Sequence, residues 1–166
     1  MGDTKFGGRW PISVLPAIDA ANLAAARQLF LDYAGSLGFS LCFQGFDREM
    51  AAFPGAYGYG HRGTLLLGRV DGVPAGVVAL RDLGNGVCEM KRLFVAPGAR
   101  RTGLGHALAT GIVAAGRDLG YVAMRLDTLE TMTAAMGLYL SLGFRPCADY
   151  NGNPLPGVKF FELKPL

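Results

Sequence analysis

The chain has 166 residues, of which 51% are hydrophobic and 17% charged, and its net charge is +3. This composition excludes a disordered chain, and no apolar run is long enough to span a bilayer, so we expect no membrane partner. The basic residues form no long cluster, which argues against a nucleic-acid partner, and the scattered cysteines favour a reduced, cytoplasmic protein without a metal site. The length predicts a single domain over residues 1–166, with residues 1–10 as a loosely ordered arm.

Hydrophobic periodicity and turn residues predict strands and helices in a mixed order. In the first half we expect a strand at Ile12–Ala17, a helix over roughly 20–37 behind the cap Asp19, a short helix around Phe46–Phe53, and two hairpin strands at Thr64–Val70 and Ala75–Arg81. In the second half we expect strands at 87–95, Val122–Asp127, Phe144–Cys147 and Val158–Leu163, and helices at 103–119 and Thr133–Leu142. This order predicts an α+β layered structure.

The segment 96–108, APGARRTGLGHAL, combines two adjacent cations with the start of the clearest predicted helix. The first N–H groups of a helix have no partner inside it and carry partial positive charge. Gly103 and Gly105 let a ligand approach this backbone closely, and Arg100 and Arg101 add charge and donors. The pattern indicates a site for a phosphate or a diphosphate. An ordinary strand-to-helix turn with solvated arginines is the alternative.

Two other phosphate-binding patterns do not account for this segment. Gly103-x-Gly105 is followed by Leu108 where the dinucleotide fingerprint needs a third glycine, and the sequence contains no Walker A pattern. The segment GYGHRG at 58–63 matches G-x-G-x-x-G literally, but it leads into a strand instead of a helix. We therefore interpret that match as accidental.

Together with its neighbours, RRTGLG at 100–105 resembles the R/Q-x-x-G-x-G/A signature of the GNAT family of N-acetyltransferases. The resemblance runs from about Thr64 to Cys147 and includes CEMKRLFVAP before the signature and AAMGLYLSLGF after it. It implies a central mixed, mostly antiparallel sheet of about six to seven strands with about four helices. It also implies that acetyl-CoA, the cosubstrate, is bound by Leu93, Phe94, Val95, Arg100, Arg101, Thr102, Gly103, Leu104, Gly105 and His106.

Glu89 is the predicted general base. It lies in a largely apolar strand, eleven residues before Arg100, where similar members of the family carry such a base. An ammonium has no lone pair and must lose a proton before its nitrogen attacks a thioester. Two alternatives stay open: Glu89 pairs with Lys91, Arg92 or a neighbouring strand, or a water relay moves the proton.

Tyr139 is the predicted general acid, because in similar enzymes the tyrosine of this L-Y-x-x-x-G-F segment lies beside the cofactor sulfur. A phenol, with a pKa of about 10, can protonate the departing thiolate at neutral pH. The alternative is an aromatic residue on the core face of an amphipathic helix. The family often has an asparagine seven residues before this tyrosine, where this chain has Met132. Thr131 and Thr133 are the candidates to replace its contact with the pantetheine arm.

The segment 41–63 is predicted to form the acceptor wall, because this region varies with the acceptor in the family. Its FQGFDREMAAFPGAY stretch resembles a subgroup of small bacterial members. An acceptor that bears a carboxylate would suit its hydrogen-bonding and cationic side chains, although arginines in loops are more often solvated. The candidate acceptor-binding residues are Gln44, Arg48, Tyr57 and Tyr59.

The resemblance implies transfer of an acetyl group to a primary amine of a small molecule or peptide, by direct attack in a ternary complex. No covalent nucleophile is expected, since the sequence has no G-x-S-x-G elbow. The alternative function is an acyl-CoA-binding module or sensor with a degenerate acceptor site, to which Met132 gives some support. Homodimers are common among similar proteins.

Overall fold

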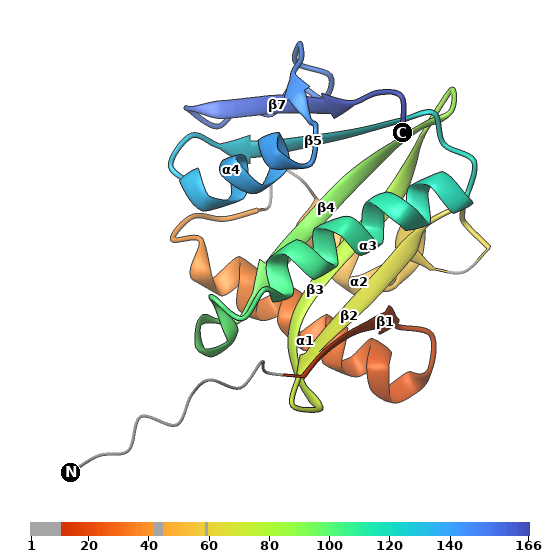
Figure 1. Cartoon of the computed structure of the whole chain (residues 1–166), viewed down its shortest axis with the longest axis vertical. Helices are drawn as coiled ribbons and strands as arrows, with labels where there is room; N and C mark the ends of the chain where they lie inside the picture. The colour runs from red at the N-terminus through yellow and green to blue at the C-terminus, as the bar shows by residue number, and fades with distance from the viewer. Residues whose placement is uncertain (1–10, 42–44, 59) are drawn as a thin grey trace.

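The computed structural model describes residues 11–41, 45–58 and 60–166, so the arm expected at residues 1–10 lies outside the described residues. A seven-stranded sheet with the strand order β1-β2-β3-β4-β5-β7-β6 forms the centre of the fold (Figure 1). Among the described residues, four α-helices flank this sheet. No helix in this part of the chain has both the length and the hydropathy of a membrane span.

The predicted α+β class and most of the predicted elements are confirmed. The strands are β1 (Ile12–Pro16), β2 (Thr64–Val70), β3 (Val73–Gly84), β4 (Val87–Val95), β5 (Ala123–Leu129), β6 (Arg145–Pro146) and β7 (Val158–Leu163). The helices are α1 (Ala20–Ser36), α2 (Phe46–Ala52), α3 (Leu104–Asp118) and α4 (Thr133–Ser141), with short 3-10 turns η2 (Gly55–Tyr57) and η3 (Pro97–Ala99). Strand β3 is longer than predicted at both ends, because it pairs with its neighbours along its length.

Two tight turns build the central hairpins. Asp71 and Gly72, with φ of +50° and +78°, join β2 to β3. Asn85 and Gly86, with φ of +55° and +77°, join β3 to β4. Two successive left-handed residues form the turn whose twist matches that of antiparallel strands, and Asp-Gly and Asn-Gly are its preferred sequences. These two dipeptides therefore fix the register of the three central strands.

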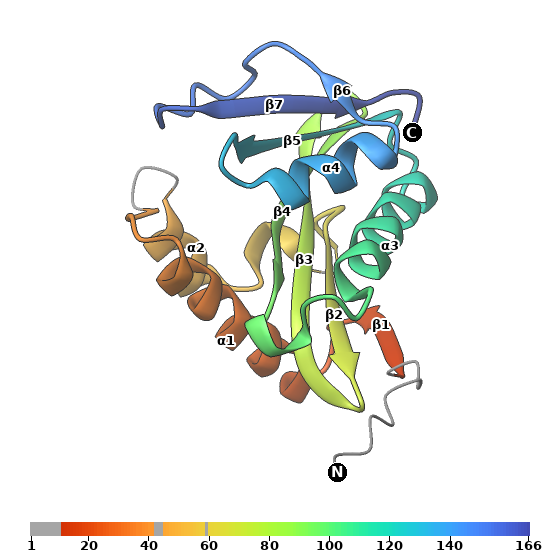
Figure 2. The same cartoon turned by 60° about the vertical axis from the view of Figure 1, so that its left-hand side comes forward.

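Strand β4 pairs with β5 over a short distance and then leaves it. The two strands run parallel, and their pairing covers only Val87–Glu89 against Ala123–Arg125. All other neighbouring pairs in the sheet are antiparallel. Beyond the paired residues β4 and β5 diverge, which opens the sheet into a V (Figure 2).

A β-bulge lies in β4 where this divergence begins. Lys91 pairs with Ala79 of β3 and Phe94 pairs with Val77, so β4 has one residue more than β3 in this interval. Arg92 absorbs the extra residue with a left-handed φ of +58°. A bulge bends its strand and re-aims the side chains beside it. The bend therefore contributes to the departure of β4 from β5.

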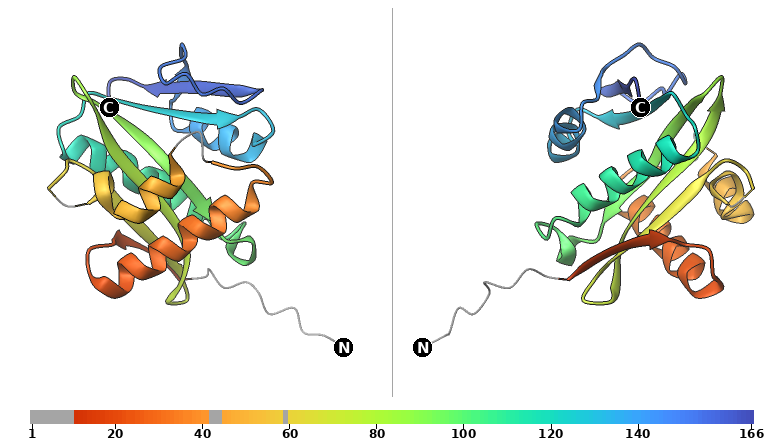
Figure 3. Two further views of the ribbon diagram at one scale, coloured as in Figure 1. Left: turned by 180° about the vertical axis from the view of Figure 1, so that it is seen from behind. Right: turned by 45° about the vertical axis from the view of Figure 1, so that its right-hand side comes forward.

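The helices cover the two faces of the sheet, with α3 on one face and α1 and α2 on the opposite face (Figures 1 and 3). Alternate residues of β2 and β3 supply the two cores. Leu66 and Val78 belong to the core that includes α3 and α4, whereas Leu67 and Val77 belong to the core under α1 and α2. Each face of the central strands is thus buried under helices, in keeping with their nearly continuous apolar sequence.

Two glycines let α3 lie close to the sheet. An added Cβ on Gly68 would come within 2.6 Å of Leu104 Cδ1, and one on Gly76 within 2.8 Å of Leu108 Cδ1. Leu104 and Leu108 are fully buried on the first turns of α3. These glycines therefore set the position of the N-terminal end of α3 over β2 and β3.

We expect Gly76→Ala to lower the free energy of unfolding by about 1–3 kcal/mol, the usual cost of overpacking a core. The added methyl also meets the Phe94 carbonyl oxygen at 3.1 Å, so Leu108 cannot relieve the whole conflict by moving. Urea unfolding measures the change. The control is Gly137→Ala on α4, where an added Cβ has no atom within 4 Å. A Gly76→Ala protein as stable as the parent would contradict the close approach of α3.

Candidate active site

Helix α3 begins directly after Gly103, which is its N-cap with a φ of +91°. Glycine takes this left-handed conformation without steric cost. The hydroxyl of Thr102 donates a hydrogen bond of 2.6 Å to the carbonyl oxygen of Ala99 and so fixes the preceding loop. The first turn of α3 contains no acidic residue. The Leu104 N–H donates to Thr102 Oγ1 at 3.4 Å, and the following N–H groups and the positive end of the helix dipole are open to an anion.

A cavity of about 670 Å³ lies at this helix start, and we call it the mouth cavity. Its wall is formed by β4, the start of α4 and the α3 loop, including Arg100, Arg101 and Gly105. Both arginines are exposed. An added Cβ on Gly105 would lie 3.6 Å from Val95 Cγ2, an ordinary contact, so protein packing does not require glycine there. The bare backbone instead faces the cavity.

The structure brings most of the predicted cofactor residues to this one wall. The residues that line the mouth cavity are Leu93, Phe94, Val95, Arg100, Arg101 and Gly105. The other four residues, all of them described, lie beside the cavity. Leu104 is buried against the sheet and His106 is exposed, while Thr102 and Gly103 shape the loop and the cap. Thr102, Gly103 and Leu104 therefore determine the geometry of the helix start and do not line the cavity themselves.

The edge of β4 toward β5 continues the mouth cavity. Because β5 pairs with β4 only as far as Glu89, the backbone groups of 93–95 on that side have no strand partner among the described residues. Such groups need a hydrogen-bonding partner or water. Met132, which stands where the family often has asparagine, lines this cavity together with Thr131 and Thr133. Both candidate replacements are thus at the cavity wall.

A second cavity, the inner cavity, lies deeper between β4 and β5. It shares Tyr33, Leu93, Met132 and Ala135 with the mouth cavity, so the two adjoin along one wall. Tyr139 of α4 lines the inner cavity and packs edge-on against Phe144, with 5.9 Å between ring centroids. The predicted general acid therefore lies at the far end of the path that begins at the α3 helix start.

The Tyr139 phenol is suited to holding a proton. The residue is only 6% exposed, and burial raises its pKa well above the ordinary value. Among the described residues none forms a hydrogen bond with its hydroxyl. A neutral phenol that faces a cavity can donate its proton to a leaving group in that cavity.

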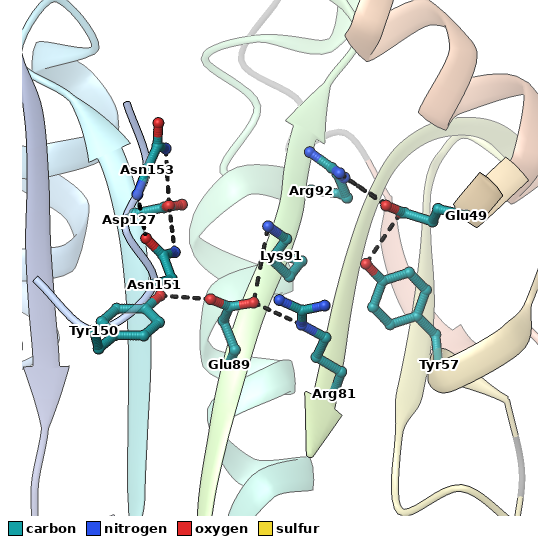
Figure 4. Close-up of polar contacts among 10 residues, drawn as sticks. All are labelled: Glu49, Tyr57, Arg81, Glu89, Lys91, Arg92, Asp127, Tyr150, Asn151 and Asn153. Carbon is teal, nitrogen blue, oxygen red and sulfur yellow. Dashed lines mark hydrogen bonds and ion pairs between the residues drawn. The ribbon is translucent and has the colours of Figure 1, made fainter. Parts of the chain in front are cut away.

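Glu89 is fully buried and has three polar neighbours (Figure 4). Its Oε1 accepts a 2.7 Å hydrogen bond from Arg81 Nε and lies 3.8 Å from Lys91 Nζ, and its Oε2 accepts a 2.6 Å hydrogen bond from the Tyr150 hydroxyl. The predicted alternative of pairing with Lys91 or a neighbouring strand covers Lys91 and Arg81 of β3, whereas Arg92 pairs with Glu49 instead and Tyr150 was not predicted. Both carboxylate oxygens thus have donors, and Glu89 lines neither the mouth cavity nor the inner cavity.

Arg92, the bulge residue, is clamped by α2 (Figure 4). Its Nη2 and Nε donate to Glu49 at 2.8 and 3.3 Å, and Glu49 also accepts a 3.0 Å hydrogen bond from the Tyr57 hydroxyl. The Arg92 guanidinium lies over the Phe46 ring, 5.3 Å from its centroid. Only 3% of the Arg92 side chain and 16% of the Glu49 side chain is exposed. The clamp holds the bend of β4 against α2.

We expect Glu49→Gln to lower the free energy of unfolding by about 3 kcal/mol, because it removes a carboxylate that pairs with a buried guanidinium. Thermal or urea unfolding measures the loss. Glu130→Gln is the matched control, since Glu130 pairs with Lys159 at 3.7 Å with both side chains more than half exposed. An exposed pair of this kind contributes at most about 1 kcal/mol. Equal effects of the two substitutions would disprove a stabilising clamp at Arg92.

The predicted acceptor wall is described only in part. Gln44 and Tyr59 lie outside the described residues. Arg48 and Tyr57 line a cavity of about 330 Å³ beside α2, which also contacts Arg81. The Tyr57 ring is buried and its hydroxyl donates to Glu49, so this side chain supports the clamp. Arg48 is exposed on the same wall.

The structure adds polar residues that the sequence analysis did not select. A fourth cavity, the polar pocket, has a volume of about 140 Å³ and is lined by Arg81, Lys91, Asp127, Asn151, Gly152, Asn153 and Pro154. Lys91, Asp127 and Asn153 also line the inner cavity. Asp127 is a lone carboxylate in the apolar strand MRLDTL, the same signal that singled out Glu89. That signal could have identified Asp127 as well.

No cluster of three or more histidine, cysteine or acidic side chains suited to a metal ion occurs among the described residues. The described cysteines, Cys88 and Cys147, are both free thiols. Burial raises the pKa of the Cys88 thiol to about 12, which keeps it protonated and poorly nucleophilic.

A family model, a relative and solved structures of known proteins all match this chain. Residues 26–144 match the acetyltransferase (GNAT) family model. An uncharacterized N-acetyltransferase of Schizosaccharomyces pombe is 39% identical over 140 residues, which cover 83% of this chain and 85% of the relative. A GNAT-family acetyltransferase of Staphylococcus aureus matches the fold with a TM-score of 0.75 at 17% identity, over 93% of this chain and 99% of that one.

A Salmonella typhimurium protein solved with its cofactor acetyl-CoA matches the fold with a TM-score of 0.70 at 19% identity, over 92% of this chain and 93% of that one. The likeness to both solved structures extends over nearly the whole chain. Together with the family match, it confirms the resemblance seen in the sequence. The chain belongs to the GNAT family and is an acetyltransferase.

Proposed function

We propose that this enzyme transfers the acetyl group of acetyl-CoA to a primary amine of a small molecule or peptide, by direct attack in a ternary complex. One observation carries the proposal: adjoining cavities run from the start of α3 to Tyr139 between the diverging strands β4 and β5. The acetyl-CoA bound to the Salmonella typhimurium neighbour supports the choice of acyl donor.

The residues along this path suit the diphosphate, the pantetheine arm and the thioester of acetyl-CoA in that order. The α3 helix start, with Arg100 and Arg101 beside it, suits the diphosphate, because its N–H groups and both guanidinium groups favour an anion. The unpaired edge of β4 at 93–95 suits the amide groups of the pantetheine arm. Tyr139 at the inner end suits the thioester sulfur.

When bound, acetyl-CoA supplies a thioester carbonyl carbon, the electrophile of the reaction. The amine nitrogen forms the new C–N bond there while the C–S bond breaks. Tyr139 donates its phenolic proton to the departing sulfur, and the proton that the amine loses passes to Glu89 or, through water, to solvent.

A screen of amines, amino acids and peptide N-termini with acetyl-CoA tests the proposed function, with thiol release as the readout. We expect thiol release that depends on at least one acceptor class and a stoichiometric N-acetylated product. Binding of acetyl-CoA without turnover on any acceptor would overturn the proposal and favour the acyl-CoA-binding module.

The role of Glu89 stays a prediction with its own test. We expect Glu89→Gln to bind acetyl-CoA as tightly as the parent and to reduce kcat by about 10²–10⁴-fold, the usual contribution of a general base. Thermal unfolding shows whether the variant is folded, since the change also alters the pairing of Arg81. A folded variant with an unchanged kcat would mean that Glu89 only pairs with its neighbours and that a water relay moves the proton.

A further inference from the structure

The polar pocket has opposite charges on its two sides (Figure 4). Asp127 of β5 supplies a carboxylate, and Arg81 of β3 and Lys91 of β4 supply cations. The two cations also face Glu89, at 2.7 and 3.8 Å from its Oε1, but Glu89 is fully buried and does not line the pocket. Such a pocket matches a molecule that also carries one charge of each sign.

Asp127 is held so that one of its oxygens faces the pocket. Its Oδ2 accepts hydrogen bonds from the side-chain amides of Asn151 at 2.8 Å and Asn153 at 3.0 Å. Asn151 and Asn153 lie in the loop before β7. This loop is itself ordered by Asn151 and Asn153 oxygens that accept from backbone N–H groups two residues on. Among the described residues none donates a hydrogen bond to Asp127 Oδ1. A partly buried carboxylate with an open oxygen is a binding group for an ammonium.

Arg81 presents its terminal nitrogens toward the same pocket. Its Nε is engaged by Glu89, but neither Nη atom donates to a described residue. The side chain is 39% exposed and lines both the polar pocket and the cavity beside α2. A guanidinium with its terminal N–H groups open binds a carboxylate through two parallel hydrogen bonds.

The polar pocket adjoins the place where the acetyl group would be transferred. It shares Lys91, Asp127 and Asn153 with the inner cavity, and the inner cavity contains Tyr139. Asp127 therefore lies at the boundary of the two cavities, where an ammonium on it would leave the rest of the acceptor in the polar pocket. The pocket volume of about 140 Å³ is small beside the roughly 300–1,000 Å³ of sites for drug-sized ligands, which restricts the acceptor to a small head group.

We propose that the polar pocket is the acceptor site and that it selects an α-amino acid, with the amino group on Asp127 and the carboxylate on Arg81 beside Lys91. This inference rests on the proposed function. It predicts that an amine without the carboxylate leaves the Arg81 end unmatched, and that an anion without the amine leaves Asp127 unmatched. Both losses are costly because the pocket walls are partly desolvated.

The experiment compares matched acceptors that differ in one charge. Free α-amino acids, their methyl esters and the corresponding decarboxylated amines are each assayed by thiol release with saturating acetyl-CoA. We expect the preferred amino acid to exceed its methyl ester in kcat/KM by at least about 100-fold, as expected when a site loses the carboxylate for which it was built. Esters and decarboxylated amines that react as well as the free acids would overturn the inference while leaving the proposed function intact.

Two variants test the two ends of the pocket one at a time. Asp127→Asn keeps the shape of the side chain but removes its charge, and we expect it to lower kcat/KM for every amine by about 100-fold or more while the Kd of acetyl-CoA is unchanged. Arg81→Lys keeps a cation beside Glu89 but removes the paired Nη groups, and we expect the ratio of acid to ester to fall toward one. Variants that keep the parental kcat/KM and the parental ratio would refute this assignment.

A binding measurement on the parent enzyme tests the pocket without a variant, so its result does not depend on whether a variant folds. Isothermal titration of the parent enzyme with the preferred amino acid, in the presence of coenzyme A, should show binding that its methyl ester lacks. Equal binding of acid and ester would count against the pocket. Absence of thiol release with every acceptor, in contrast, would remove the proposed function and this inference with it.

Discussion

Gly105→Glu should raise the stability of the protein and at the same time weaken acetyl-CoA binding by about 100-fold or more, which is about 2.7 kcal/mol. A carboxylate in the first turn of α3 stabilises the helix dipole by about 0.3–1 kcal/mol, and replacing glycine adds about 0.5–1 kcal/mol. The same charge would repel the diphosphate, since two like charges 4 Å apart interact by about 4 kcal/mol near a protein surface. Calorimetric titration and thermal unfolding measure the two effects.

Gly105→Gln is the matched control for that substitution. It adds the same bulk without the charge, and the site has room for a Cβ at 3.6 Å from Val95 Cγ2. We expect Gln to weaken binding by much less than Glu does. If both variants bind acetyl-CoA as tightly as the parent, the diphosphate does not lie at this helix start.

Tyr139→Phe should reduce kcat by about 10²–10⁴-fold, which is the usual contribution of a general acid, with little change in the Kd of acetyl-CoA. Burial raises the pKa of this phenol, so it stays protonated as the pH rises through about 10. The removed atom is the hydroxyl oxygen that faces the inner cavity, and the ring that packs against Phe144 is kept. Steady-state kinetics and acetyl-CoA titration separate the two parameters.

Tyr121→Phe is the control for loss of a buried phenol. Tyr121 donates its hydroxyl to the carbonyl oxygen of Arg62 at 2.7 Å and lines neither the mouth cavity nor the inner cavity. We expect it to lower stability by about 1 kcal/mol and to leave kcat unchanged. If the Tyr139→Phe enzyme keeps the parental kcat, then Tyr139 only packs in the core and is not the general acid.

The parts of the fold that local chemistry dictates could be predicted from the sequence. The cap at Asp19, whose Oδ1 accepts from the Asn22 N–H at 2.9 Å, and the Asp-Gly turn at 71–72 depend on neighbouring residues only. The helix start at Gly103 also depends on neighbouring residues only, because its glycines, its arginines and the first apolar residues of the helix all lie within 96–108. The start of α3 after Gly103 could therefore be predicted with its position in the fold.

The remaining features depend on contacts between distant segments. CEMKRLFV reads as one uninterrupted strand, and the extra residue at Arg92 becomes visible only in the pairing with β3. Asp127 acquires its amide partners from residues 24 and 26 positions later, in a loop whose path the local sequence does not determine. Tyr57 was predicted at the acceptor wall, but its hydroxyl is engaged by Glu49 of α2.

The central claim is that the start of α3 binds a diphosphate and so places a thioester between β4 and β5. A crystal structure of the enzyme with coenzyme A tests it most directly. We predict diphosphate oxygens within hydrogen-bonding distance of backbone N–H groups of 103–106, and the sulfur in the inner cavity beside Tyr139. A structure in which the diphosphate lies elsewhere, with the helix start at Gly103 in contact with water alone, would contradict the account.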